Sequence, residues 1–314
     1  MSRLRFFEDS QPTETGSKNP VFVPSGQEKN DDGLDDNYKL SARYRCEQFN
    51  TTKVEDHITF HCDTKKQYLL KLTPGRKAQV VLEQYLYKVN PPALKDAIAA
   101  TEKLEFDKEN VAFGLHADNS IKSVNNFAAL QQKWNQFKPE LINSELYRTI
   151  GRTNPAAAEG LIQGGDLEFG TEDVLLKTYD KSLFYHTIFN DFDPEKDRES
   201  KQQLEFNSQI FVNVPLELEL THGVINDSER TTEVMTVGKL NKGKLNEDTL
   251  IQQYNQFYKP IIEYDFTEYI FEYIIRRTVD KNSGLILSAT VQLKEAVKYN
   301  YEFVTQFDLK KLED

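Results

Sequence analysis

The chain has 314 residues, of which 50 are Asp or Glu and 39 are Lys or Arg, so its formal net charge is −11. This length suits one large domain or two small ones, and its 15 Tyr and 20 Phe argue against disorder throughout. Binding to a phosphate backbone depends on clustered Lys and Arg, so we expect no nucleic-acid partner. No run approaches 18 consecutive apolar residues, so we expect no transmembrane segment.

The first 38 residues differ in composition from the rest. They contain eight acidic and four basic residues, including the acidic cluster Asp31–Asp36. Such a segment cannot bury enough apolar surface to offset the entropy cost of ordering it. We therefore expect a flexible acidic tail over 1–38, followed by a single domain over 39–314. Two short apolar groups are candidate docking segments of the tail: Phe6 and Phe7, and Val21, Phe22 and Val23.

Apolar and polar residues alternate from Lys39 onward, which is typical of half-buried strands. Four antiparallel strands should open the domain. They are expected at 40–46, 58–62, 67–72 and 78–89. A turn centred on Val54 would place Cys46 opposite Cys62. We expect the two cysteines to be free, buried thiols if the protein is in a reducing cytoplasm. A disulfide between them would imply an oxidising compartment.

Helices are expected in the middle of the chain. Pro91-Pro92 begins the first, because proline suits a first helical turn, and a hairpin follows over 111–124. Asn125 or Asn126 should cap the next helix with its side chain. One face of that helix is apolar and should face the core; it carries Leu130, Trp134, Phe137 and Leu141.

The next helix is expected after a glycine-bearing stretch from Gly151 to Gly165, with Thr171 as its cap. A solvated link over 191–203 leads to further strands, and Asn246 should cap a helix up to Tyr258. These strands are expected at 204–212, 216–220 and 231–240.

The chain ends in a pattern typical of a long hairpin. Two strands, Tyr264–Val279 and Leu285–Leu309, flank the turn sequence 280–284. One face of these strands is rich in aromatic residues. These residues either form cross-strand pairs and core or line a cleft for an apolar ligand or a partner chain. The candidate cleft residues are Tyr269, Phe271, Tyr273, Tyr299, Tyr301 and Phe303.

Strand groups that alternate with helices, without a regular strand-helix-strand repeat, indicate the α+β class. We expect a curved antiparallel sheet, similar to a half-barrel, packed on several helices. Its concave face should pack on the helix that carries Trp134 and on that helix's companions. Two weakly similar halves, 39–160 and 161–314, are an alternative organisation.

Three segments form a pattern: Val89-Asn90-Pro91-Pro92, the stretch 118–127 with Trp134 seven positions later, and the stretch 280–289. Together they resemble uncharacterised proteins of Bacteroidota bacteria. The resemblance implies a curved-sheet fold with an Asn-capped helix and a long final hairpin, and an envelope location. It carries no catalytic residues. The printed start lacks the apolar region of a signal peptide, which predicts a cytoplasmic protein, or an envelope protein if a leader was removed.

The sequence offers no clear metal or catalytic motif, so we expect no cofactor. His57 and His61 would lie about 13 Å apart on a strand, at 3.3 Å per residue, with Cys62 on the other face, so one metal ion cannot join them. The alternating acids of 191–199 imitate a calcium loop but have Lys196 where such a loop needs Gly. Nucleotide-binding glycine motifs and a nucleophile-elbow serine are absent from the sequence.

Three functions follow from these patterns. The first is a bacterial binding or assembly protein that acts through protein contacts, with a tail segment that docks on its partner. The second is a carrier or sensor that encloses a hydrophobic small molecule in a curved-sheet cleft. The third is a hydrolase with unrecognised carboxylates, since 50 acidic residues always offer candidate pairs. The sequence does not favour an enzyme.

Overall fold

The computed structural model describes residues 38–189 and 202–313. The candidate docking segments of the tail and the acidic stretch 191–199 lie outside the described residues. Within the described part, no helix is long and apolar enough to cross a membrane.

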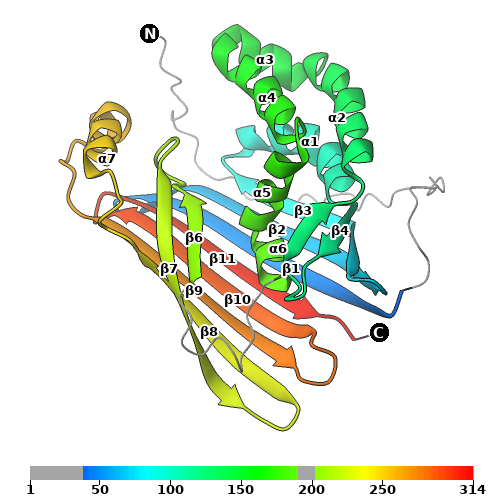
Figure 1. Ribbon diagram of the computed structural model, residues 1–314. Helices are drawn as coiled ribbons and strands as arrows, with labels where there is room; N and C mark the ends of the chain where they lie inside the picture. Colours follow the sequence, from blue (N-terminus) through cyan, green and yellow to red (C-terminus); the bar gives the residue numbers. More distant parts are fainter. Residues whose placement is uncertain (1–37, 190–201, 314) are drawn as a thin grey trace, which may run out of the picture.

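Eleven strands form one antiparallel sheet (Figure 1). They are β1 (Leu40–Val54), β2 (His57–Thr73), β3 (Lys77–Asn90), β4 (Val111–Leu115), β5 (Ile121–Val124), β6 (Gln202–Asn207), β7 (Pro215–Asp227), β8 (Thr231–Leu240), β9 (Tyr269–Asp280), β10 (Ile286–Val297) and β11 (Tyr301–Lys311). Their order across the sheet is β5-β4-β3-β2-β1-β11-β10-β9-β8-β7-β6, so the first and last strands of the chain pair at its centre.

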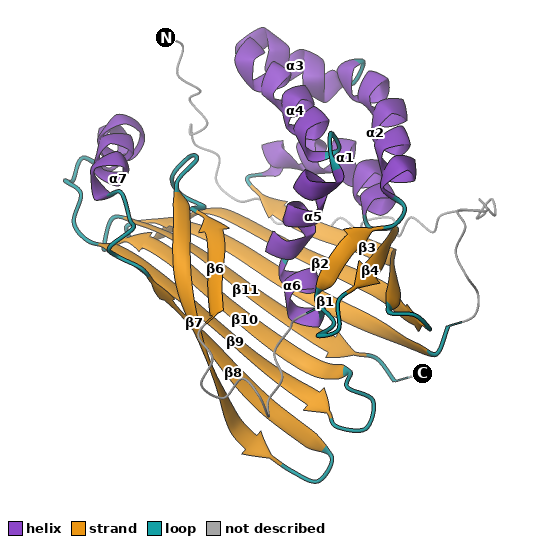
Figure 2. Ribbon diagram, viewed as in Figure 1, coloured by secondary structure: helices purple, strands orange, loops and turns teal. Residues whose placement is uncertain are grey.

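The helices gather on one face of this curved sheet (Figure 2). They are α1 (Lys95–Lys108), α2 (Phe127–Ile142), α3 (Glu145–Thr153), α4 (Pro155–Glu168), α5 (Glu172–Lys181), α6 (Leu183–Ile188), α7 (Glu247–Gln253) and α8 (Lys259–Ile262), with short helical turns η1 (Pro92–Leu94) and η2 (Tyr254–Tyr258). The predicted α+β class, with a curved antiparallel sheet packed on helices, is confirmed.

The face of the sheet toward the helices holds the core. Tyr44, Val80, Tyr273, Ile275 and Val291 are each at most 1% exposed. The sequence analysis placed the helix carrying Trp134 on this concave face. The apolar face of α2 is buried in the same core as the sheet residues; α2 itself lies against α1 and α3, and α6 contacts the central strand β10.

The two strands expected at 58–62 and 67–72 are one continuous strand, β2. The polar residues between them stay in the ladder because β2 pairs with β1 on one side and with β3 on the other throughout this stretch, and two of them also form ion pairs. Lys65 lies 2.9 Å from Glu47, and Lys66 lies 2.9 Å from Glu105 on α1. The division of this segment into two strands at its polar run was therefore wrong.

The final hairpin is also divided differently. The strand expected over Leu285–Leu309 is interrupted after Val297, where Tyr299 adopts a left-handed φ of 69° and the Asn300 amide donates to the Val297 carbonyl over 2.9 Å. This turn creates β10 and β11. Similarly, β6 ends before 208–212, because Ser208 and the Gln209 amide donate to the Glu295 carboxylate.

The stretch from Gly151 to Gly165, expected to precede a helix, is itself mostly helical (α3 and α4). Asn154 caps α4 by accepting from the Ala157 amide over 3.1 Å. Gly165 is needed there for close packing, because a Cβ at that position would lie 2.2 Å from Cη2 of Trp134.

Two smaller expectations also change. Asn126 occupies the N-cap position of α2, but its side chain accepts from the Ala112 amide over 2.9 Å instead of capping the helix. The β1–β2 turn follows Val54, and the register pairs Cys62 with Asn50, so Cys46 is not opposite it. Both cysteines are free and buried.

Candidate functional site

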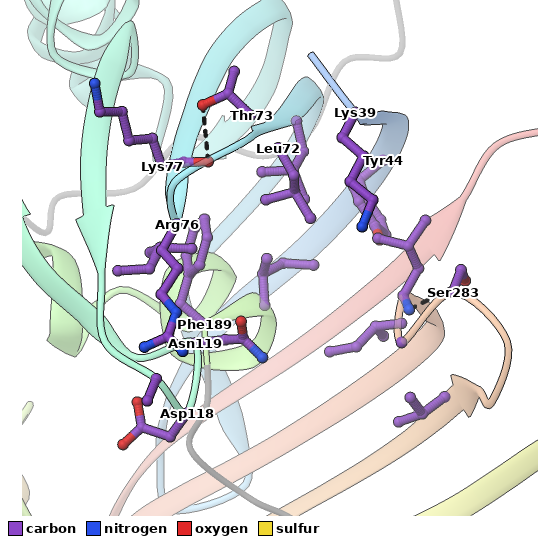
Figure 3. Close-up of a pocket in the computed structure, with 18 of the residues that line it drawn as sticks. Lys39, Tyr44, Leu72, Thr73, Arg76, Lys77, Asp118, Asn119, Phe189 and Ser283 are labelled. Carbon is purple, nitrogen blue, oxygen red and sulfur yellow. Dashed lines mark hydrogen bonds between the residues drawn. The ribbon is translucent and has the colours of Figure 1, made fainter.

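A cavity of about 960 Å³ opens on the concave side of the sheet. Its walls come from elements far apart in the sequence: the start of β1, the β2–β3 and β4–β5 turns, the end of α6, the start of β6 and the β9–β10 turn. Figure 3 shows these side chains converging from several ribbons. We call this the cavity end of the sheet, marked by Lys39, Arg76, Asn119 and Ser283.

The turns that form the rim are fixed by local chemistry. In the β9–β10 turn, the Asp280 carboxylate accepts from the amides of Asn282 and Ser283 over 2.8 and 3.1 Å, and Gly284 adopts a φ of +70°. The amide donors lower the pKa of Asp280.

The β2–β3 turn is tied to β4 across the rim. Gly75 and Arg76 both have positive φ, 83° and 59°, and the Arg76 carbonyl accepts from the Leu115 amide over 2.8 Å. This bond holds two walls of the cavity together at the base of the Arg76 side chain.

The floor of the cavity is apolar. Tyr44, Leu70, Val234, Leu285 and Ile286 line it and are each less than 9% exposed. Side chains of this kind offer an apolar molecule contact without a desolvation cost.

One buried cation interrupts this apolar surface. Arg277 on β9 lines the cavity and is 4% exposed. Gln202 on β6 also lines the cavity, and its side chain hydrogen-bonds His222 on β7 over 3.1 Å. His222 in turn hydrogen-bonds Thr236 on β8 over 2.9 Å. The deep part of the cavity therefore has polar groups from β6 and β9 beside its aliphatic floor.

The rim carries a positive charge on an acidic protein. Lys39, Arg76 and Lys77 are exposed there, and none of them forms an ion pair with a described residue. Asp118 is the one carboxylate among the lining residues; its Oδ1 accepts from the hydroxyl and the amide of Ser120, which lowers its pKa. In Figure 3, Lys39 and Arg76 extend toward the cavity, whereas Lys77 points away.

His186 on α6 lies near Arg277, His222 and the Tyr273 ring, whose centroid is 6.4 Å from that of the imidazole. Burial, together with the positive charge of Arg277, lowers the pKa of His186 to about 3. Its Nε2 has no hydrogen-bond partner among the described residues. The imidazole is therefore neutral at physiological pH and is not tuned for acid–base catalysis.

The cavity offers binding contacts more than reactive groups. Its single lining carboxylate is already engaged by Ser120, so no carboxylate pair faces it. Across residues 38–189 and 202–313, no three His, Cys, Asp or Glu side chains are grouped so that they could hold a metal ion.

The six aromatic residues singled out in the sequence lie elsewhere, and none of them lines the cavity. Tyr269 and Tyr273 are buried, Phe271, Tyr301 and Phe303 are half-buried, and Tyr299 is 82% exposed at the β10–β11 turn. Whether they contact a ligand or a partner stays a prediction.

Two of these aromatic residues belong to a cluster near the β10–β11 turn. The rings of Tyr258 and Tyr301 lie 4.5 Å apart, Phe211 packs on both Tyr258 and Tyr269, and the Tyr269 hydroxyl donates to Glu295 over 2.8 Å. We call this the tyrosine end of the sheet. Side chains fill the space over the sheet at the tyrosine end, whereas a cavity remains at the cavity end.

Comparison with protein-family models found no match, and comparison with curated proteins found none either. Among solved structures, the chain is similar to one described as lipid–protein interactions in lipovitellin, with 10% identity and a TM-score of 0.44. The match covers 87% of this chain and 25% of that one, so the chain spans about a quarter of the length of that protein.

Proposed function

We propose that this protein binds a small amphipathic molecule, with an apolar body and an anionic head, in the cavity at the cavity end of the sheet. The observation that carries the proposal is the combination of an apolar floor with a cationic rim around about 960 Å³. Small-molecule sites are typically concave, mostly apolar and roughly 300–1,000 Å³ in volume.

The apolar part of the ligand would lie against the floor. Each CH₂ group moved from water to such a surface gains about 0.8 kcal/mol, so a chain of about ten carbons supplies most of the affinity. The floor side chains are already buried in the described structure, and the site is therefore largely formed before the ligand arrives.

The anionic part of the ligand would lie at the rim. Lys39 and Arg76 extend toward the cavity there, and the protein surface as a whole is acidic. A local positive rim on an acidic protein selects a carboxylate, sulfate or phosphate head and orients it outward. The assembly role predicted from the sequence, through contacts of the folded body and a docking segment of the tail outside the described residues, stays a prediction.

The test compares dodecanoate with dodecanol by isothermal titration calorimetry. We expect wild-type protein to bind dodecanoate more tightly than dodecanol. Ile188→Trp, at the end of α6 in the cavity wall, should reduce the affinity for both by at least about tenfold, because the larger side chain fills the apolar space.

The matched control is Ile142→Trp, at an exposed position of α2 that is not part of the cavity wall. It should bind as wild type does, and thermal melts should show that both variants fold. Equal binding by Ile188→Trp and wild type, or no binding of dodecanoate by wild type, would overturn the proposal.

A further inference from the structure

The described chain begins at the mouth of the cavity. Tyr38 is its first residue, and Lys39, which follows, lines the rim. The Lys39 amide donates to the Leu72 carbonyl over 2.8 Å, which fixes this point of the chain beside β2. The N-terminal segment therefore joins the fold at the proposed site.

The charges of that segment and of the rim are opposite. Residues 31–36 carry four aspartates and no basic residue. At the rim, Lys39 and Arg76 extend toward the cavity, and neither has an ion-pair partner among the residues that the structure describes. Carboxylates of the tail are thus chemically similar to the anionic head that the rim would bind.

The acidic segment is also within reach. Asp36 is three residues from Lys39 and Asp31 is eight residues away. At about 3.3–3.6 Å per residue, an extended chain spans about 10 Å and about 28 Å respectively. A group tethered at this distance has a millimolar effective concentration at the rim, which a second copy of the chain in dilute solution cannot match.

We propose that the acidic segment 31–36 is a tethered competitor for the cationic rim, and that it lowers the affinity of the cavity for an anionic amphiphile. This inference rests on the proposed function and adds its regulation. A neutral amphiphile uses only the apolar floor, so its affinity does not depend on the segment. Exposed ion pairs are individually weak, so the combined effect is on the order of three- to tenfold in affinity.

The test replaces the four carboxylates of segment 31–36 by amides in the full chain: Asp31→Asn, Asp32→Asn, Asp35→Asn and Asp36→Asn. Dodecanoate should bind this variant three- to tenfold more tightly than it binds wild type, and dodecanol should bind both equally. The gain should disappear in 0.5 M NaCl, because salt screens exposed charges.

A control variant changes the net charge by the same amount away from the rim, at exposed positions outside the cavity wall. Its substitutions are Glu247→Gln, Asp248→Asn, Glu263→Gln and Glu272→Gln. It should bind dodecanoate as wild type does. Adding Lys39→Gln and Arg76→Gln to the tail variant and to wild type should abolish the difference between them, because the competition then has no target.

The outcomes separate the two proposals. If wild type and the tail variant bind dodecanoate equally, the competition is wrong and the binding function stands. If the charge-matched control gains as much as the tail variant, the gain is a general charge effect and the competition is wrong. If neither wild type nor the tail variant binds dodecanoate, both the proposed function and this inference are wrong.

Discussion

The two ends of the curved sheet differ in how the space over the sheet is filled: aromatic side chains fill it at the tyrosine end, and a cavity remains at the cavity end. At the tyrosine end, the helical turn η2 places the rings of Tyr254 and Tyr258 over the sheet, and both hydroxyls are hydrogen-bonded. Asn300 donates to the Tyr254 hydroxyl over 2.7 Å, and the Tyr258 hydroxyl donates to the Ile210 carbonyl. The large rings fill the space between the helical turn and the sheet.

At the cavity end, only the end of α6 and the tips of turns reach over the same face. Their side chains include the polar Thr73, Asn119 and Ser283 of the turns and the ring of Phe189 after α6, and they leave the space between them unfilled. The space that rings occupy at one end therefore stays open at the other. The comparison indicates that covering elements, more than the strands themselves, decide where a curved sheet can hold a ligand.

Removing a large side chain should affect the two ends unequally. Tyr254 is fully buried, so Tyr254→Ala should lower the free energy of unfolding by about 3–5 kcal/mol. Ile188→Ala, at a half-buried position beside the cavity, should cost about 1–2 kcal/mol, because the lost methyl groups already border open space. Urea denaturation measures both, and equal losses would contradict the contrast between the ends.

The helical layer beside the cavity should be rigid where α2 and α4 meet. Gly165→Ala should lower the free energy of unfolding by about 1–3 kcal/mol, since its Cβ would overlap the Trp134 ring. Gly164→Ala is the matched control: nothing lies within 4 Å of its Cβ, and alanine should add about 0.5–1 kcal/mol of stability through helix propensity. Trp134 is the single tryptophan, so its fluorescence reports both transitions. If the two variants are equally stable, the close contact is not present in solution.

His186 tests whether water from the cavity reaches α6. Its pKa of about 3 in the folded protein lies below the usual 6.5. Below pH 6.5 the imidazole therefore binds a proton in the unfolded chain but not in the folded protein. Unfolding is therefore favoured progressively as the pH falls from 6.5 toward 3, by at most about 1.4 kcal/mol per unit.

Between pH 7 and pH 5.5, wild type should lose about 1 kcal/mol more stability than His186→Phe, which keeps a ring and removes the titration. Urea denaturation at the two pH values gives the difference. A pH dependence identical in the two proteins would mean that the imidazole is hydrated, and that the hollow extends further than the cavity.

Local features of the chain were predictable from the sequence. Thr171 and Asn246 cap helices as expected, accepting from the amides of Val174 and Thr249. The apolar face of α2 is buried at all four predicted positions. Such features depend on neighbours within one or two turns of the chain, and their signal is therefore present in short stretches.

The candidate site was not predictable in the same way. The sequences at Pro74–Arg76 and 280–284 indicate turns, but nothing local places these turns beside each other and beside Lys39. Their meeting depends on the strand order and the curvature of an eleven-stranded sheet. Aromatic residues drew attention to the last hairpin instead, because aromatic content is visible in a sequence and open space is not.

The smallest effect concerns the charge of the rim. In the variant with four amides in place of the carboxylates of segment 31–36, Arg76→Gln should weaken dodecanoate binding about threefold, since one exposed cation contributes well under 1 kcal/mol. Dodecanol binding should not change. Lys298→Gln, which removes a cation at the tyrosine end that pairs with Glu268, should leave both affinities as they were. Calorimetry at 20 mM and 500 mM NaCl measures these affinities with exposed charges unscreened and screened. If Arg76→Gln and Lys298→Gln weaken dodecanoate binding equally, the effect comes from the overall charge and the rim has no special part in binding.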